Sequence, residues 1–142
     1  NMFVAKLVGD PPMNFVAAKL ISSGGRLFLE IGNGVLTFYD GGLPGLEDWI
    51  DSDVTMGVRP HDIQIHEYEG RNCLNAKLLA IEPISSDYEI TVELVNGKIL
   101  KVKSTENHSR LKGKGIWLKI DINNIHLFNS ENEEAIYHGE GL

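Results

Sequence analysis

The sequence has five histidines, whose side chains could bind a metal ion, and they are densest in the stretch His61-Asp62-Ile63-Gln64-Ile65-His66. Imidazole nitrogens are common zinc ligands, and a shared ion needs both rings on one side of the backbone. On an extended segment His61 and His66 differ by an odd number of positions and face opposite sides. We therefore predict no metal site and interpret the histidines as surface residues, with His61 kept as a candidate contact for a ligand or a partner.

Three further side chains are candidate contacts: Arg59, Trp49 and Trp117. Arg59 could clamp an anion, although an arginine beside a strand-ending proline more often braces a neighbouring carboxylate or carbonyl. Trp49 stands in an acidic stretch and could stack on a sugar ring, but tryptophan is also a common anchor at protein interfaces, which we favour here. Trp117 lies on the more polar face of a predicted strand, either as a residue of a second core or as part of a contact surface.

No catalytic constellation can be placed on the sequence. ATP hydrolysis needs a glycine-rich cradle ending in Gly-Lys-Ser/Thr, because backbone N–H groups and the lysine surround the phosphates. Gly97-Lys98 and Gly113-Lys114 are followed by Ile99 and Gly115, so neither supplies the hydroxyl that binds magnesium. We therefore predict a non-catalytic chain without catalytic, cofactor-binding or metal-binding residues.

The composition narrows the classes of partner. The chain has 142 residues, enough for one domain or two small subdomains, and its formal charge of -7 repels phosphate backbones, which argues against nucleic acid. The single cysteine, Cys73, cannot close an intrachain disulfide, so we expect a reducing, cytoplasmic compartment and a packing role. Apolar stretches fall far short of the roughly 20 residues that span a bilayer, so any membrane association is indirect.

The elements that would position these side chains are strands. Alternation of apolar and polar residues with a period of two recurs along the chain, with turn signals between the segments, and about ten short strands indicate an all-β barrel or paired barrels. The exception is a short amphipathic helix at residues 1–9, which Pro11 and Pro12 end. We expect this chain to begin inside a longer protein.

Register can be predicted in the second half of the sequence. A three-residue loop, Val95-Asn96-Gly97 with Gly97 left-handed, would oppose Val92 to Leu100 and Ile90 to Val102. Leu74, Ala76, Leu78 and Ala80 are predicted to share one buried face. The stretch Ser22-Ser23-Gly24-Gly25 is interpreted as a turn between two strands.

Three segments resemble one known family. Residues 3–15, FVAKLVGDPPMNF, are similar to the junction that follows the nucleotide-binding domain in ATPase subunits of maltose- and glycerol-phosphate-type ABC importers. Gly57-Val58-Arg59-Pro60 and His126-Leu127-Phe128 resemble two later motifs of the same family, in the same order. His61 stands where the family most often has Glu, so the role of that carboxylate is not carried over.

The resemblance implies an OB-fold-type regulatory domain with a TOBE-like barrel. It divides the chain into a connecting helix and junction (1–12), a first OB-like subdomain (13–66) and a TOBE-like subdomain (67–142), with strands shared between the last two.

The resemblance also implies a function. The domain would pair with its own copy. It would also contact the ATPase domain of its subunit, which lies upstream and would bind ATP and magnesium. Through that domain it would indirectly contact the permease subunits at the inner face of the plasma membrane. It could also receive a cytoplasmic regulatory protein. An alternative is a small-ligand sensor for oxyanions or sugars, since OB folds bind such molecules. A nucleic-acid-binding OB fold is a third hypothesis, which the charge disfavours.

Overall fold

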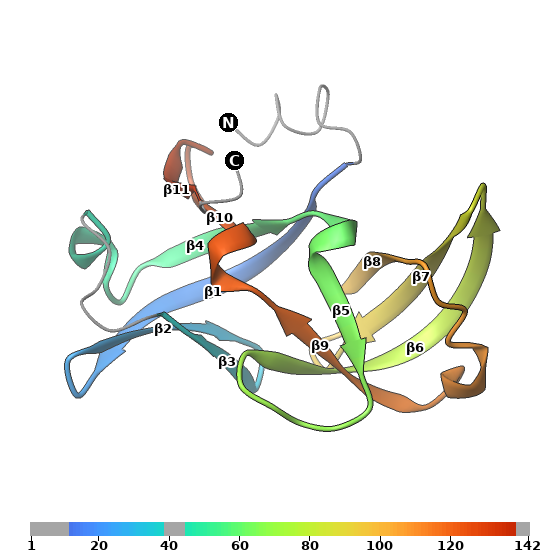
Figure 1. Cartoon of the computed structure of the whole chain (residues 1–142). Helices are drawn as coiled ribbons and strands as arrows, with labels where there is room; N and C mark the ends of the chain where they lie inside the picture. The colour runs from blue at the N-terminus through green and yellow to red at the C-terminus, as the bar shows by residue number, and fades with distance from the viewer. Residues whose placement is uncertain (1–11, 39–44, 139–142) are drawn as a thin grey trace.

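The computed structural model describes residues 12–38 and 45–138, and the predicted helix and most of the junction lie outside them. The described residues form two antiparallel sheets (Figure 1). The six-stranded sheet has the order β11-β10-β4-β1-β2-β3, and the five-stranded sheet has the order β5-β9-β6-β7-β8. The predicted all-β fold is thus confirmed.

The strands of the six-stranded sheet come from both ends of the chain: β1 (Asn14–Ser23), β2 (Arg26–Ile31), β3 (Gly34–Thr37), β4 (Asp53–Val58), β10 (His126–Asn129) and β11 (Ala135–His138). The five-stranded sheet consists of β5 (Ile63–His66), β6 (Cys73–Ile84), β7 (Asp87–Leu94), β8 (Ile99–Ser104) and β9 (Gly115–Ile120). Within the described residues, four single-turn 3-10 helices connect them: η1 (Glu47–Trp49), η2 (Pro60–Asp62), η3 (Ser109–Leu111) and η4 (Ile122–Asn124).

One hydrophobic core serves both sheets. The alternation in β1 buries Val16, Ala18 and Leu20 on one face, and the same buried cluster includes Val92 of β7 and Leu118 of β9. The five-stranded sheet is strongly curved, so its edge strands β5 and β8 approach one another and η2 lies beside β8 (Figure 1). This curvature makes the second sheet barrel-like, as closure of an OB fold requires.

The predicted hairpin register is confirmed. Val92 pairs with Leu100 and Ile90 with Val102, and Gly97 has a φ of 90°. The N–H of Leu94 donates to the carbonyl of Lys98 at 2.8 Å, which leaves three residues in the loop. The left-handed residue that a bulged three-residue hairpin needs is therefore supplied by glycine.

The turn between β1 and β2 is also confirmed. Ser23 pairs with Arg26, and Gly24 and Gly25 have φ angles of 59° and 78°. Positive φ at both central residues is the requirement of a type I′ turn, which two glycines meet without a steric cost.

The prediction for Ala80 is wrong. The pairing of β6 with β7 shifts between Leu78 and Ala80, so Ala80 lies opposite Thr91 and is exposed. The extra residue in this β-bulge reverses the faces of all residues that follow it, and Ile81 takes the inward direction opposite Ile90. Alternation within β6 alone could not reveal a residue inserted relative to β7.

Among the described residues, no helix has the length and apolar character needed to cross a membrane.

Candidate functional site

The three motif segments of the sequence meet at one end of the six-stranded sheet. Asn14 pairs with Val58 and Phe15 with Gly57, because β1 and β4 are neighbours. On the other side of β4, Gly57 pairs with His126 of β10. We call this cluster the joint, and it comprises Met13, Asn14, Phe15, Gly57, Arg59, His126 and Phe128.

Asn14 ties the start of β1 to the other sheet. Its Nδ2 donates to the carbonyl of Lys101 at 2.9 Å, and its Oδ1 accepts from the N–H of Lys101 at 2.9 Å. Lys101 lies on β8, an edge strand of the five-stranded sheet. The side-chain amide thus satisfies both backbone groups of an edge residue, as a neighbouring strand would.

Gly57 is required by close packing in the joint. A Cβ placed on Gly57 would overlap Sδ of Met13 and lie 3.1 Å from Cε2 of Phe128. The ring of Phe128 also packs edge-on against Phe15, with ring centroids 6.0 Å apart. Residues from three separate segments are therefore fitted to one another over the buried backbone of Gly57.

Arg59 and His126 form the polar contact of the joint. Nη1 of Arg59 lies 3.2 Å from Nε2 of His126, a residue that is only 4% exposed, so the interpretation of the histidines as surface residues is wrong for His126. Because a guanidinium can only donate, Nε2 accepts and the ring carries its hydrogen on Nδ1. Arg59 thus braces an imidazole, whereas the sequence argument expected a carboxylate or a carbonyl.

Asn72 makes a second contact of the same kind as Asn14. Its Oδ1 accepts from the N–H of Thr37 at 2.7 Å, and its Nδ2 donates to the carbonyl of Thr37 at 3.3 Å. Thr37 lies on β3, an edge strand of the six-stranded sheet, and Asn72 precedes β6 of the other sheet. Asn72 has a φ of 56°, a left-handed conformation that asparagine tolerates better than most residues.

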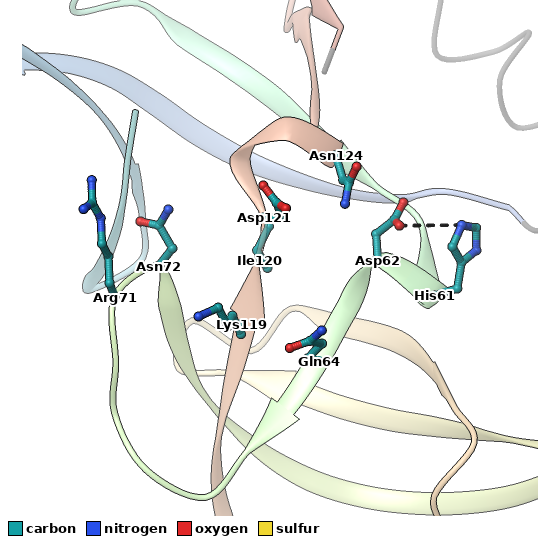
Figure 2. Close-up of a pocket in the computed structure, with 9 residues that line it drawn as sticks. All are labelled: His61, Asp62, Gln64, Arg71, Asn72, Lys119, Ile120, Asp121 and Asn124. Carbon is teal, nitrogen blue, oxygen red and sulfur yellow. Dashed lines mark ion pairs between the residues drawn. The ribbon is translucent and has the colours of Figure 1, made fainter. Parts of the chain in front are cut away.

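A polar hollow of about 500 Å³ lies next to Asn72, over the start of β6, the end of β9 and the adjoining strand β5. Figure 2 shows its walls. It is lined by His61 and Asp62 of η2, Gln64 of β5, Arg71 and Asn72 of the turn before β6, Lys119 and Ile120 of β9, and Asp121 and Asn124 at η4. We call this the polar hollow.

The charged groups of the polar hollow differ in whether they are paired. Asp62 lies 3.7 Å from Nε2 of His61, and Asp121 accepts a hydrogen bond from the N–H of Asn123 at 2.9 Å. Within residues 12–38 and 45–138, the side chains of Arg71 and Lys119 have neither an ion pair nor a hydrogen bond. The hollow therefore presents two unpaired cations beside two carboxylates that already have a partner.

Pairing of β9 with its neighbours sets the position of Lys119. It lies between Gln64 of β5 and Cys73 of β6, and Figure 2 shows its side chain extending on the side of the Arg71–Asn72 turn. Cys73 is buried and packs there as expected, with its thiol 3.6 Å from the carbonyl of Arg71. The two cations thus come from segments far apart in the sequence.

Trp117 borders a second hollow that adjoins the first. This hollow of about 380 Å³ shares Arg71 and Asn72 with the polar hollow and also includes Val35 and Asn75. Trp117 and Lys119 stand two positions apart on β9 and so share a face of the strand. The indole ring is half-buried, which leaves part of it available to a ligand or a partner.

The four predicted contact residues do not form one site. Trp49 is half-buried against the core at η1, and Arg59 belongs to the joint. His61 lines the polar hollow and Trp117 the adjoining one. Sequence reasoning missed Arg71 and Lys119, and the one available signal was the place of Lys119 on the polar face of its strand.

His61 lies in η2, which begins at Pro60, and not on a strand. The prediction that His61 and His66 face opposite sides of one extended segment therefore does not apply. His61 and His66 both border another hollow, where β5 faces β8. In the part of the chain that the structure describes, no three His, Cys, Asp or Glu side chains are grouped in a way that could hold a metal ion.

Comparison with known families finds two matches in tandem. The family described as the MalK OB fold domain matches residues 9–63, and the family described as the TOBE domain matches residues 69–127.

The similar proteins are ABC transporter ATP-binding proteins. The chain is 33% identical over 129 residues to the protein y4oS of Sinorhizobium fredii, an alignment that covers 91% of this chain and 32% of that protein. It is 28% identical to the trehalose/maltose import ATP-binding protein MalK of Thermococcus litoralis, with 96% and 38% covered. For the xylose/arabinose import ATP-binding protein XacK of Haloferax volcanii, the identity is 27%, with 99% and 36% covered. The chain therefore spans about a third of the length of these relatives.

A solved structure has the same fold. It is the cytoplasmic molybdate-binding protein ModG with molybdate bound, which aligns with a TM-score of 0.57 and 16% identity over 80% of this chain and 94% of that one. The likeness supports the OB-type fold alone.

Proposed function

We propose that this non-catalytic module, in which residues 9–63 match the MalK OB fold family and residues 69–127 match the TOBE family, is the regulatory and dimerisation domain of a sugar importer's ATPase subunit. In this proposal two copies of the domain contact each other and hold two ATPase domains together while these open and close around ATP. ATP and magnesium bind in the upstream domain, and the assembly lies on the cytoplasmic face of the membrane beside the permease subunits. The transported substrate class is a sugar, in line with the names of two relatives.

The observation that carries the proposal is the joint. The junction motif leads directly into Met13, Asn14 and Phe15, and these residues are fixed to β4, β10 and β8. A displacement of the segment before Met13 would therefore act on both sheets at once. Such rigid coupling is what a module needs if its pairing state is to follow the state of an attached ATPase domain.

A division of the chain after residues 12 and 66 remains our proposal, and the gap between the two family matches, 9–63 and 69–127, supports the second boundary. In it the junction (1–12) enters a first OB-like unit (13–66), and β10 and β11 of the TOBE-like unit (67–142) complete the sheet of the first. A regulatory protein that binds one arrangement of the paired domains better than the other would shift the balance between them by its difference in affinity.

Trp49 is the residue that we propose for the pairing surface. Its ring packs on the core with one part and is exposed with the other, and a partly buried tryptophan loses little side-chain entropy when a partner covers it. Arg59 is engaged with His126, so its proposed contribution is to hold the joint. His61 and Trp117 are assigned instead to the two adjoining hollows.

Sedimentation equilibrium of the 142-residue chain tests the pairing. We expect a reversible dimer with a dissociation constant on the order of 100 μM, because further contacts of the parent are missing. Trp49→Phe keeps an aromatic ring on the core and should weaken dimerisation several-fold, whereas the matched Trp117→Phe should leave it unchanged. A strict monomer at several hundred micromolar contradicts the dimer role, and equal effects of the two substitutions contradict the assigned surface.

A second candidate function, sensing of a small ligand, is favoured by one observation. Arg71 and Lys119 place two unpaired cations in a hollow of about 500 Å³. This size lies within the range of about 300–1,000 Å³ that is usual for small-molecule sites.

A further inference from the structure

We propose that the polar hollow binds a phosphorylated sugar, with the phosphate on Arg71 and Lys119 and the hydroxyls on the opposite wall. The inference rests on the second candidate function, ligand sensing, and is independent of the dimer role. It assigns to that function a place in the fold and a chemical class of ligand.

The phosphate end follows from the two cations. Arg71 is held at the mouth of the hollow by the turn whose next residue, Asn72, is fixed to Thr37 by two hydrogen bonds. Lys119 projects from β9 next to that turn (Figure 2). A guanidinium presents a planar fork that suits two phosphate oxygens, and an ammonium adds a compact charge, so the pair complements a dianion.

The opposite wall of the hollow is suited to hydroxyl groups. Figure 2 shows Asp121 and Asn124 beyond the end of β9, away from Arg71, and Gln64 of β5 beside Lys119, its partner on β9. Amides offer both donors and acceptors, and carboxylates accept, so together they match hydroxyls that donate and accept at once. Asp121 is held by the N–H of Asn123, which fixes its direction without using its second oxygen.

The two carboxylates also argue against a simple anion as the occupant. Asp62 and Asp121 would repel a second negative group, so the negative charge of the ligand has to be confined to the end near Arg71 and Lys119. A neutral polyol carrying one phosphate has this distribution of charge. Inorganic phosphate lacks the part that would contact Gln64 and Asn124.

Trp117 lies outside the proposed site. It borders the adjoining hollow on the side of Arg71, whereas the sugar is placed toward Asp121 and Asn124. Trp117 is therefore neither a phosphate ligand nor a contact of the sugar ring in this proposal.

Isothermal titration of the 142-residue chain with glucose 6-phosphate, glucose, inorganic phosphate and AMP tests the proposal. We expect glucose 6-phosphate to bind with a dissociation constant on the order of 100 μM, and glucose and phosphate to bind at least tenfold more weakly. Arg71→Gln and Lys119→Gln should each weaken the binding of glucose 6-phosphate by about tenfold or more. Lys98→Gln is the matched control, since Lys98 lies on the β7–β8 loop outside both hollows and should leave the affinity unchanged.

Three outcomes overturn the inference. The first is an absence of binding by glucose 6-phosphate, the second is binding that survives both substitutions, and the third is equal or tighter binding of phosphate or AMP. Sedimentation of the same samples separates this inference from the dimer role, because a chain that dimerises but binds no ligand loses only the assignment made here.

Discussion

The joint and the polar hollow lie close together in the fold but are built in opposite ways. In the joint, Asn14 and Arg59 have defined partners, and Gly57 is buried under Met13. In the hollow, Arg71 and Lys119 extend from exposed positions without a partner among the described residues. The difference teaches that the segments with recognisable motifs hold the architecture together, while the groups free to bind something stand in segments that carry no motif.

The substitution Gly57→Val should give the largest effect on this comparison. The added side chain collides with Met13 and Phe128 in a packed site, and overpacking of this kind costs about 3 kcal/mol of unfolding free energy. Chemical denaturation followed by circular dichroism measures the loss.

A second substitution shows whether the close contact itself is the cause. Gly57→Ala should cost less, and Met13→Ala in the same chain should recover part of that cost because it removes the sulfur atom in the way. If the effects of the two substitutions on the unfolding free energy are additive, the contact with Met13 is not the cause of the loss in Gly57→Ala.

The substitution Asn14→Ala should give the next largest effect. It removes both hydrogen bonds to Lys101, so we expect a loss of about 1–2 kcal/mol in unfolding free energy. Asn14→Asp keeps the acceptor for the N–H of Lys101 but faces its carbonyl with a second acceptor, so it should not restore stability. Hydrogen exchange at the amide of Lys101 gives a local readout, and unchanged protection in Asn14→Ala would contradict this role.

The smallest effects are expected in the polar hollow. Because Arg71 and Lys119 are exposed and unpaired, Arg71→Gln and Lys119→Gln should each change the unfolding free energy by less than about 0.5 kcal/mol. Thermal unfolding, with Lys98→Gln as the control, measures this. A loss as large as that of Asn14→Ala would mean that the hollow is part of the architecture, and the contrast with the joint would fail.

Local features of the fold could be predicted from the sequence. The two glycines after Ser23 predicted the turn between β1 and β2, and the position of Gly97 predicted the register of β7 with β8. These features depend on residues near one another in the chain. The bulge before Ala80 could not be predicted, because it depends on the register in which the residues of β6 pair with those of β7.

The sites could be predicted only in part, because they depend on contacts between distant residues. Asn14 and Lys101 are 87 positions apart, and nothing near either residue indicates the other. Arg71 and Lys119 become neighbours only through the pairing of β6 with β9. The motifs did identify the segments of the joint, but they did not show that Arg59 would find its partner in His126.

The two asparagine contacts have a consequence for solubility. Thr37 and Lys101 lie on β3 and β8, each an edge strand of its sheet, and an edge strand offers unpaired backbone groups on which another chain can assemble. By bonding both backbone groups of these residues, Asn72 and Asn14 remove one docking position from each edge. The same amides that join the two sheets therefore also guard the protein against edge-to-edge aggregation.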